Sequence, residues 1–210
     1  MAKDVTIVFN YRSPFCALIV DRFFRLTRSY DVRLEWKIAR EVPRPSSFPI
    51  TEDNPRFQYN RQDCERRAKW LGLDWKPQDW RLGGVESASL LGQHLLDTAS
   101  PVFATYTVAM NRAYWCNGLN ASDPAVVRQL ALSVGVSKSE LFAAEKRTEI
   151  LTRELDDTQA WCSHNGVLGV PFFIAGEQRF WGSDRFAALL RHLSDLGCGE
   201  PSAELVCNLI

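Results

Sequence analysis

The chain has 210 residues, with 25 Lys and Arg against 25 Asp and Glu. This length predicts one elaborated domain or two closely packed ones, with a core that needs neither metal nor disulfide support. The balanced charge disfavours nucleic acid as a partner, because a nucleic-acid site needs a clustered excess of Lys and Arg. The start of the sequence holds neither a long apolar run nor a cleavage pattern, so we expect a soluble, cytoplasmic protein without membrane contact.

The first elements in chain order form a βαβ unit. Residues 5–9 are β-branched and apolar, which predicts a buried strand. A helix is predicted from Phe15 onward, with Ser13 as its N-cap and Pro14 at its first position. Residues 32–38 alternate apolar and polar, which predicts a second strand. Such a unit implies a right-handed crossover between parallel strands.

The middle of the chain is predicted to be almost entirely helical. A Pro-rich stretch over residues 43–55 breaks the strand pattern. Gly72 is placed to end the first helix that follows, and Ser137 with Glu140 forms a capping-box pattern. The predicted helices cover residues 61–71, 87–96, 102–116, 124–134, 138–144 and 148–165.

Strand character returns near the end of the chain. Residues 171–175 and 178–181 predict a β-hairpin, followed by a helix over 185–196 and an irregular tail. The order βαβ…ββα predicts an α/β fold, a thioredoxin-like sheet interrupted by a large helical insertion. We therefore expect residues 1–50 and 165–210 to form the thioredoxin-like domain, and residues 51–164 the insertion.

The six cysteines are predicted to be mostly isolated, buried thiols. No two of them are two residues apart, which removes both the redox pair motif and the usual zinc-ligand spacing, so no metal site is expected. The cysteines are Cys16, Cys64, Cys116, Cys162, Cys198 and Cys207.

The first chemical motif is Ser13-Pro14-Phe15-Cys16 at the start of the front helix. A helix N-terminus stabilises an anion, and redox proteins of this architecture place a cysteine there, whose pKa is thereby lowered. The hydroxyl of Ser13 does not ionise usefully, but it can donate a hydrogen bond to a thiolate brought by a ligand. The alternative is that Ser13 is only an N-cap.

Two further motifs lie near the end of the chain. The proline of Gly169-Val170-Pro171 stands where thioredoxin-like folds have a cis-proline, which would turn the Val170 backbone toward an extended ligand; an ordinary proline at a strand start is the alternative. In Gly182-Ser183-Asp184-Arg185, the amides of Ser183 and Asp184 could hold a carboxylate and the Asp184 side chain an ammonium group. Capping of the last helix is the alternative for this motif.

These three motifs, in this order, resemble the 2-hydroxychromene-2-carboxylate isomerases and the kappa-class glutathione transferases. Both belong to a DsbA-like branch of the thioredoxin superfamily. The resemblance covers about residues 4–195, and it includes the pattern from Arg56 through Tyr59, Asp63 and Gly72 and the segment 117–124. It departs from the family at Arg56, where a Lys is usual, at Asn10, where Asp is frequent, and at Cys16, where a second Ser is frequent.

The resemblance implies glutathione as the cofactor and assigns roles to individual residues. Ser13 would be the catalytic residue that supports the glutathione thiolate, and Arg56 and Asn54 would bind the substrate, with Arg56 in place of the usual Lys. A metal has no role in this scheme. The implied glutathione-binding residues are Ser13, Phe15, Val170, Pro171, Ser183 and Asp184.

The function implied is that of a glutathione-dependent cis-trans isomerase acting on 2-hydroxychromene-2-carboxylate or a similar oxo acid from the breakdown of aromatic compounds. The thiolate would add to the electrophilic carbon, allow rotation about the former double bond, and leave again. Two alternatives stay open: a kappa-like glutathione transferase or peroxidase acting on small electrophiles, and a non-catalytic thioredoxin-like binding module. The resemblance also implies a homodimer.

Overall fold

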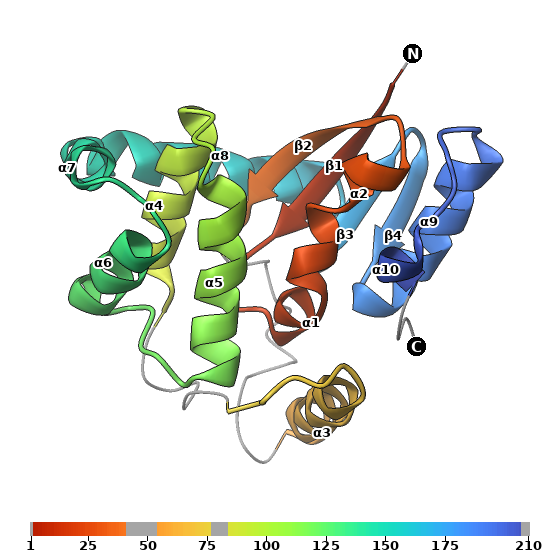
Figure 1. Cartoon of the computed structure of the whole chain (residues 1–210), viewed down its shortest axis with the longest axis horizontal. Helices are drawn as coiled ribbons and strands as arrows, with labels where there is room; N and C mark the ends of the chain where they lie inside the picture. Colours follow the sequence, from red (N-terminus) through yellow and green to blue (C-terminus); the bar gives the residue numbers. More distant parts are fainter. Residues whose placement is uncertain (1, 41–53, 77–83, 207–210) are drawn as a thin grey trace.

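The sheet at the centre of the molecule has four strands. A computed structural model of the chain describes residues 2–40, 54–76 and 84–206. The strands lie in the order β2-β1-β3-β4, with β1 at Lys3–Phe9, β2 at Val32–Ile38, β3 at Phe172–Ala175 and β4 at Gln178–Trp181. β1 and β2 are parallel, whereas β3 is antiparallel to β1 and β4 to β3 (Figure 1). The βαβ and ββα patterns predicted this sheet, and the α/β fold class is confirmed.

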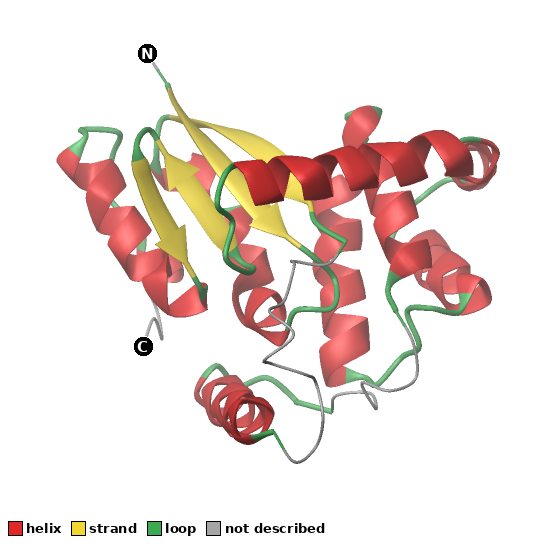
Figure 2. Ribbon diagram, turned by 180° about the vertical axis from the view of Figure 1, so that it is seen from behind, coloured by secondary structure: helices red, strands yellow, loops and turns green. Residues whose placement is uncertain are grey.

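Alternation along the strands gives the sheet two apolar faces. On β1, Ile7 and Phe9 are buried on the face covered by α1 (Pro14–Phe23) and α9 (Phe186–Asp195). Val8 faces the other way and packs with Cys162 of α8 (Thr148–His164). Figure 2 shows α8 on the viewer's side of the sheet. Burial on both faces fixes the register, because a slip by one residue would exchange the two sets of side chains.

Every described regular element between β2 and β3 is a helix, as the sequence predicts. α5 (Phe103–Cys116) packs against α1, and α4 (Glu86–Asp97) packs against α5 and α8 (Figure 1). The predicted boundary between residues 50 and 51 lies outside the described residues. None of the described helices is both long and apolar enough to cross a bilayer. The other described helices between β2 and α8 are α3 (Pro55–Trp70), α6 (Pro124–Ser133) and α7 (Lys138–Lys146).

The observed elements differ from the predicted ones mainly at helix ends. The front helix ends at Phe23, and a separate short helix, α2 (Leu26–Ser29), follows it. α3 begins at Pro55 rather than at residue 61, because the Asn54 side chain caps it and proline is favourable at the first position. The tail, predicted to be irregular, contains α10 (Ala203–Val206). That prediction is wrong because Leu205 is buried against the core and holds one helical turn there.

A buried tyrosine anchors the loop between β1 and α1. Tyr11 is fully buried, and its hydroxyl lies 3.1 Å from Oγ1 of Thr107 on α5. The ring passes directly over Gly92 of α4, so close that a Cβ there would overlap the phenol. The loop that leads into the front helix is therefore fixed to two helices of the insertion.

The junction of α4 and α8 carries a cluster of charged groups. The Arg147 guanidinium lies 2.9 Å from an Asp97 carboxylate oxygen, 3.5 Å from one of Glu154, and 3.1 Å from Nδ1 of His94. Burial raises the pKa of Glu154 to about 7, and the hydrogen bond with Asp97 adds to the effect. Glu154 therefore keeps its proton up to near neutral pH, while Arg147 forms an ion pair with Asp97.

Candidate functional site

Ser13 is the N-cap of α1, as predicted. Its Oγ accepts the backbone N–H of Cys16 at 3.2 Å, and its own N–H is donated to Oδ1 of Asn10 at 2.8 Å. Pro14 has no N–H group to donate. Of the N–H groups that a helix leaves without intrahelical partners at its start, only that of Phe15 remains for a ligand in the described structure. The helix dipole adds positive potential at the same point.

The Val170–Pro171 peptide bond is cis, which confirms the geometry expected of this motif. Ser13 Oγ donates to the carbonyl oxygen of Val170 at 3.0 Å, so the start of α1 and the start of β3 are in direct contact. The carbonyl of Pro171 accepts the N–H of Gly182 at 2.9 Å. These two hydrogen bonds bring together all three motifs, although residues 13, 170 and 182 are far apart in sequence.

Ser183 begins a short 3-10 helix, Ser183–Arg185, that leads into α9. The Ser183 side chain is 1% exposed, and its Oγ has no hydrogen-bond partner among the described residues. A buried hydroxyl without a partner is unusual and costs stability, so it is a candidate donor or acceptor for a ligand. Asp184 is exposed and forms an ion pair of 3.0 Å with Arg185, which leaves its carboxylate accessible to a second cation.

Cys16 lies one turn into α1 and is fully buried. Burial raises the pKa of its thiol to about 12, although hydrogen bonds with the Asn10 backbone and the Ser13 side chain act in the opposite direction. The thiolate is the nucleophilic form of cysteine, so this thiol is poorly suited to attack a disulfide. The four other described cysteines, Cys64, Cys116, Cys162 and Cys198, are also buried and free.

Asn54 and Arg56, the predicted substrate residues, lie at the start of α3. Oδ1 of Asn54 accepts the N–H groups of Arg56 at 2.9 Å and of Phe57 at 3.4 Å, so the Asn54 side chain serves as the helix cap. The Arg56 side chain is exposed on the first turn. α3 packs against α1 and lies apart from the sheet (Figure 1). In the structure Asn54 therefore caps α3, and Arg56 lies on an exposed turn of that helix, apart from the sheet.

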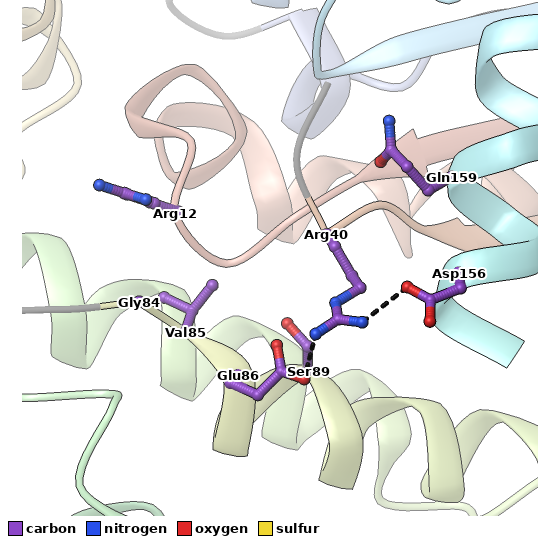
Figure 3. A pocket seen from close by; sticks show the side chains of 8 residues that line it. All are labelled: Arg12, Arg40, Gly84, Val85, Glu86, Ser89, Asp156 and Gln159. Carbon is purple, nitrogen blue, oxygen red and sulfur yellow. Dashed lines mark hydrogen bonds and ion pairs between the residues drawn. The ribbon is translucent and has the colours of Figure 1, made fainter. Parts of the chain in front are cut away.

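A hollow of about 340 Å³ opens between the loop before α1, the residues after β2, α4 and α8 (Figure 3). Arg40 projects into it and bridges Glu86 of α4 and Asp156 of α8, both at 2.6 Å. The Asn10 side chain links the hollow to the start of α1. Its amide nitrogen donates to the Arg40 carbonyl at 3.4 Å, and its Oδ1 accepts the backbone N–H of Ser13. The hollow is lined by Arg12, Arg40, Gly84, Val85, Glu86, Ser89, Asp156 and Gln159.

The sequence matches the DSBA-like thioredoxin domain family over residues 4–194, which is nearly the whole chain. The chain belongs to this family. A search of curated proteins finds no match to this DsbA-like protein.

Solved structures share the fold of this DsbA-like protein at low sequence identity. A 2-hydroxychromene-2-carboxylate isomerase is 19% identical, with a TM-score of 0.72 over 92% of this chain and 96% of the other. The cytosolic disulfide reductase DsbM from Pseudomonas aeruginosa is 14% identical, with a TM-score of 0.68 over 92% and 99%. A structure of DsbM with GSH aligns at 11% identity and a TM-score of 0.60, over 84% and 87%. At these identities the structures establish the fold and leave the activity open.

Sequence reasoning missed Arg12, Arg40 and Gln159 as candidates. A signal existed for the two arginines, because parallel strands end at the same edge of a sheet and Phe9 pairs with Ile38. Residues that follow both strands were therefore expected to lie at one edge of the sheet, and both arginines line the hollow there. Gln159 carries no such signal, since it lies on a helix more than a hundred residues away, and its position depends on how α8 packs.

Proposed function

We propose that this DsbA-like protein is a glutathione-dependent isomerase that acts on 2-hydroxychromene-2-carboxylate or a similar conjugated oxo acid. One observation carries the proposal: an alcohol, Ser13, occupies the helix start, while the only thiol nearby in the described structure, Cys16, is buried with a raised pKa. Thiol–disulfide exchange needs an accessible thiolate, and this site has none of its own. A thiolate supplied by a ligand would fill the same position.

Glutathione fits the polar groups that the three motifs bring together. The Phe15 N–H and the Ser13 hydroxyl would hold the sulfur at the positive end of α1. The backbone of Val170, beside cis-Pro171, would pair with the peptide part of the ligand. Ser183, whose hydroxyl has no partner among the described residues, and the accessible Asp184 carboxylate would hold the γ-glutamyl carboxylate and ammonium groups.

Bound glutathione would supply the sulfur nucleophile that adds to the electrophilic carbon and is later eliminated. To support it, the Ser13 hydroxyl must turn its hydrogen from the Val170 carbonyl toward the sulfur, while its oxygen still accepts the Cys16 N–H. A neighbouring cation would stabilise negative charge on the oxygen of the acid as the double-bond character is lost. The protein itself takes no electrons in this scheme.

The experiment is glutathione-dependent isomerisation by the wild type and by Ser13→Ala. A hydrogen bond to a charged group contributes about 1.5–3 kcal/mol, so kcat/KM should fall about 10- to 100-fold. Ser133→Ala, at an exposed serine of α6, is the matched control and should keep full activity. Full activity of Ser13→Ala would remove the role assigned to Ser13.

Thermal denaturation with and without glutathione tests binding separately from chemistry. Glutathione at about a hundred times its dissociation constant should stabilise the fold by about 2.7 kcal/mol. No shift at millimolar glutathione would favour the non-catalytic binding module instead. A generic electrophile turned over faster than the chromene acid would favour a kappa-like transferase.

We also propose a cellular location and an oligomeric state for the protein. Reduced thiols and millimolar glutathione belong to the cytoplasm, and we place the protein there as a homodimer. Fractionation and sedimentation at several concentrations test these two statements.

A further inference from the structure

Asn10 follows the last residue of β1 and connects that strand to the start of α1. It is buried, with 7% of its surface exposed. Its Oδ1 accepts the backbone N–H of Ser13 at 2.8 Å, and its amide nitrogen donates to the Arg40 carbonyl at 3.4 Å. The Asn10 backbone also forms a hydrogen bond with the Cys16 thiol. One buried residue therefore joins the segments that follow both parallel strands to the first turn of α1.

The two side-chain hydrogen bonds explain why an amide suits this position. The Ser13 N–H is a donor and the Arg40 carbonyl is an acceptor, so the side chain between them must accept and donate at once. An asparagine amide does both without a charge, whereas an ionised aspartate only accepts. An alanine does neither, and it would leave the buried N–H of Ser13 without this partner.

The amide lies beside the place where the proposed function puts a thiolate. Oδ1 of Asn10 is one hydrogen bond away from the backbone of Ser13, whose hydroxyl would support the sulfur. The helix start offers that anion the Phe15 N–H and the positive end of the dipole. A carboxylate at position 10 would add a second negative charge at this point, and a nearby negative charge disfavours the ionisation of an acid.

Charged groups reach the surroundings of α1 from the loop before it, from the residues after β2, and from elements that contact it, including α3, α5 and the 3-10 helix. Several of these groups form pairs of opposite sign: Arg40 with Glu86 and Asp156, Asp63 with Arg66, Asp21 with Arg112, and Asp184 with Arg185. Arg12 adds a positive charge in the loop itself, and burial keeps the Cys16 thiol neutral by raising its pKa to about 12. The Asn10 side chain hydrogen-bonds to a backbone N–H and a backbone carbonyl, neither of which carries a charge that would balance a carboxylate.

We propose that Asn10 is a positioning residue for the ligand thiolate: it fixes the start of α1 through the Ser13 N–H and the Arg40 carbonyl, and it does so without a charge that would oppose the anion. The inference rests on the proposed function, because the thiolate is that of bound glutathione. It deepens that function by naming the residue that keeps the helix start favourable to an anion. Ser13 supports the sulfur directly, whereas Asn10 acts through Ser13.

The test is a pH titration of glutathione bound to the wild type and to Asn10→Asp, followed by the ultraviolet absorbance of the thiolate. The same proteins with S-methylglutathione, which has no thiol to ionise, give the background. In the wild type the bound thiol should ionise at a lower pH than in free glutathione. In Asn10→Asp its pKa should be higher than in the wild type by about 1–2, because the new carboxylate accepts from Ser13 and stays ionised beside the sulfur.

Asn120→Asp is the matched control for the change of charge. Oδ1 of Asn120 also accepts a backbone N–H, that of Ser122 at 3.1 Å, but it lies in the loop between α5 and α6. The same substitution there should change the pKa of bound glutathione by less than about 0.3. An equal rise in both aspartate variants would overturn the proposal, because the effect would then follow from net charge and not from position 10.

Asn10→Ala separates the charge from the hydrogen bonds. It removes both side-chain hydrogen bonds and adds no charge, so it should weaken glutathione binding about tenfold but change the pKa of the bound thiol by less than about 0.5. A rise in pKa as large as in Asn10→Asp would overturn the role of charge. Melting curves check the fold of each variant. If Asn10→Asp does not fold, unchanged glutathione affinity in Asn10→Ala is the result that overturns the proposal.

The wild type separates a failure of this proposal from a failure of the glutathione site. No binding of millimolar glutathione to the wild type would refute the glutathione site, and the role of Asn10 with it. Glutathione that binds and ionises in the wild type, with the same thiol pKa in Asn10→Asp or the same affinity in Asn10→Ala, would refute the role of Asn10 alone.

Discussion

The thiol of Cys16 should be almost unreactive in the folded protein. Burial raises its pKa to about 12, against an ordinary value of 9.0, so at a given pH below 9 the thiolate is about a thousandfold rarer than for a free cysteine. At pH 8 this means about 0.01% thiolate in place of about 10%. The side chain is also fully buried, so an alkylating reagent cannot reach it without local opening.

The assay is a time course of alkylation with iodoacetamide at pH 8, with peptide mass spectrometry to identify the modified cysteine. Cys16 should react at least about a thousandfold more slowly in the native protein than in urea. A Ser133→Cys variant provides an exposed thiol in the same native sample, and that thiol should react at the rate of a free cysteine. Slow alkylation of both Cys16 and the exposed reference would point to the reagent rather than to burial.

Native alkylation of Cys16 within about tenfold of the rate in urea would refute this reasoning, because it would require a thiol that is accessible and ionised. It would also reopen thiol–disulfide chemistry for this protein. Cys16→Ala tests the same point through activity: the helix-start N–H of residue 16 is a backbone group and is retained, so glutathione-dependent turnover should stay within about twofold of the wild type.

Two further changes test the framework around the site. Gly92→Ala should lower the free energy of unfolding in urea by about 1–3 kcal/mol, because the new Cβ overlaps the fixed Tyr11 phenol. Gly84→Ala is the control: a Cβ there meets only a backbone atom at 3.9 Å, so the free energy of unfolding should stay within about 0.5 kcal/mol of the wild type. Equal urea midpoints for the two variants would contradict the overlap. Glu154→Gln should reduce the loss of thermal stability between pH 5 and pH 8. The raised pKa of Glu154, about 7 against 4.5, means that the unfolded chain releases a proton that the folded chain keeps, so the stabilisation is full below 4.5 and lost as the pH rises through 7. An unchanged pH slope in thermal melts would contradict the raised pKa of Glu154.

The sheet could be predicted from the sequence because its signals are local. Residues 32–38 show the alternation of a strand in their own side chains, and the structure has β2 at those positions. Ser13 and Pro14 specify the start of α1 by capping and by a fixed backbone angle, which are also local properties. The prediction of an irregular tail failed because α10 depends on a non-local property, the burial of Leu205 against residues distant in sequence.

The candidate site could be predicted only where short motifs reach it. Ser13, Val170 and Ser183 stand in motifs that a family resemblance can locate, and two hydrogen bonds to backbone carbonyls bring their segments together. Arg56 stands in such a motif as well, but motif position says nothing about the distance between α3 and the sheet edge. Gln159 has no motif at all, and only the packing of α8 across the sheet brings it to the hollow.

The start of α1 shows why the choice between an alcohol and a thiol decides the chemistry. A helix N-terminus favours a negative charge only at the cap, where free N–H groups and the dipole act together. In this chain the thiol stands three residues later, at Cys16, where the same helix has already buried it and the pKa rises instead of falling. The cap position holds Ser13, whose hydroxyl can donate to a sulfur anion but cannot become one. The same fold position that would activate a resident thiolate is therefore suited, under the proposed function, to a thiolate carried by a ligand.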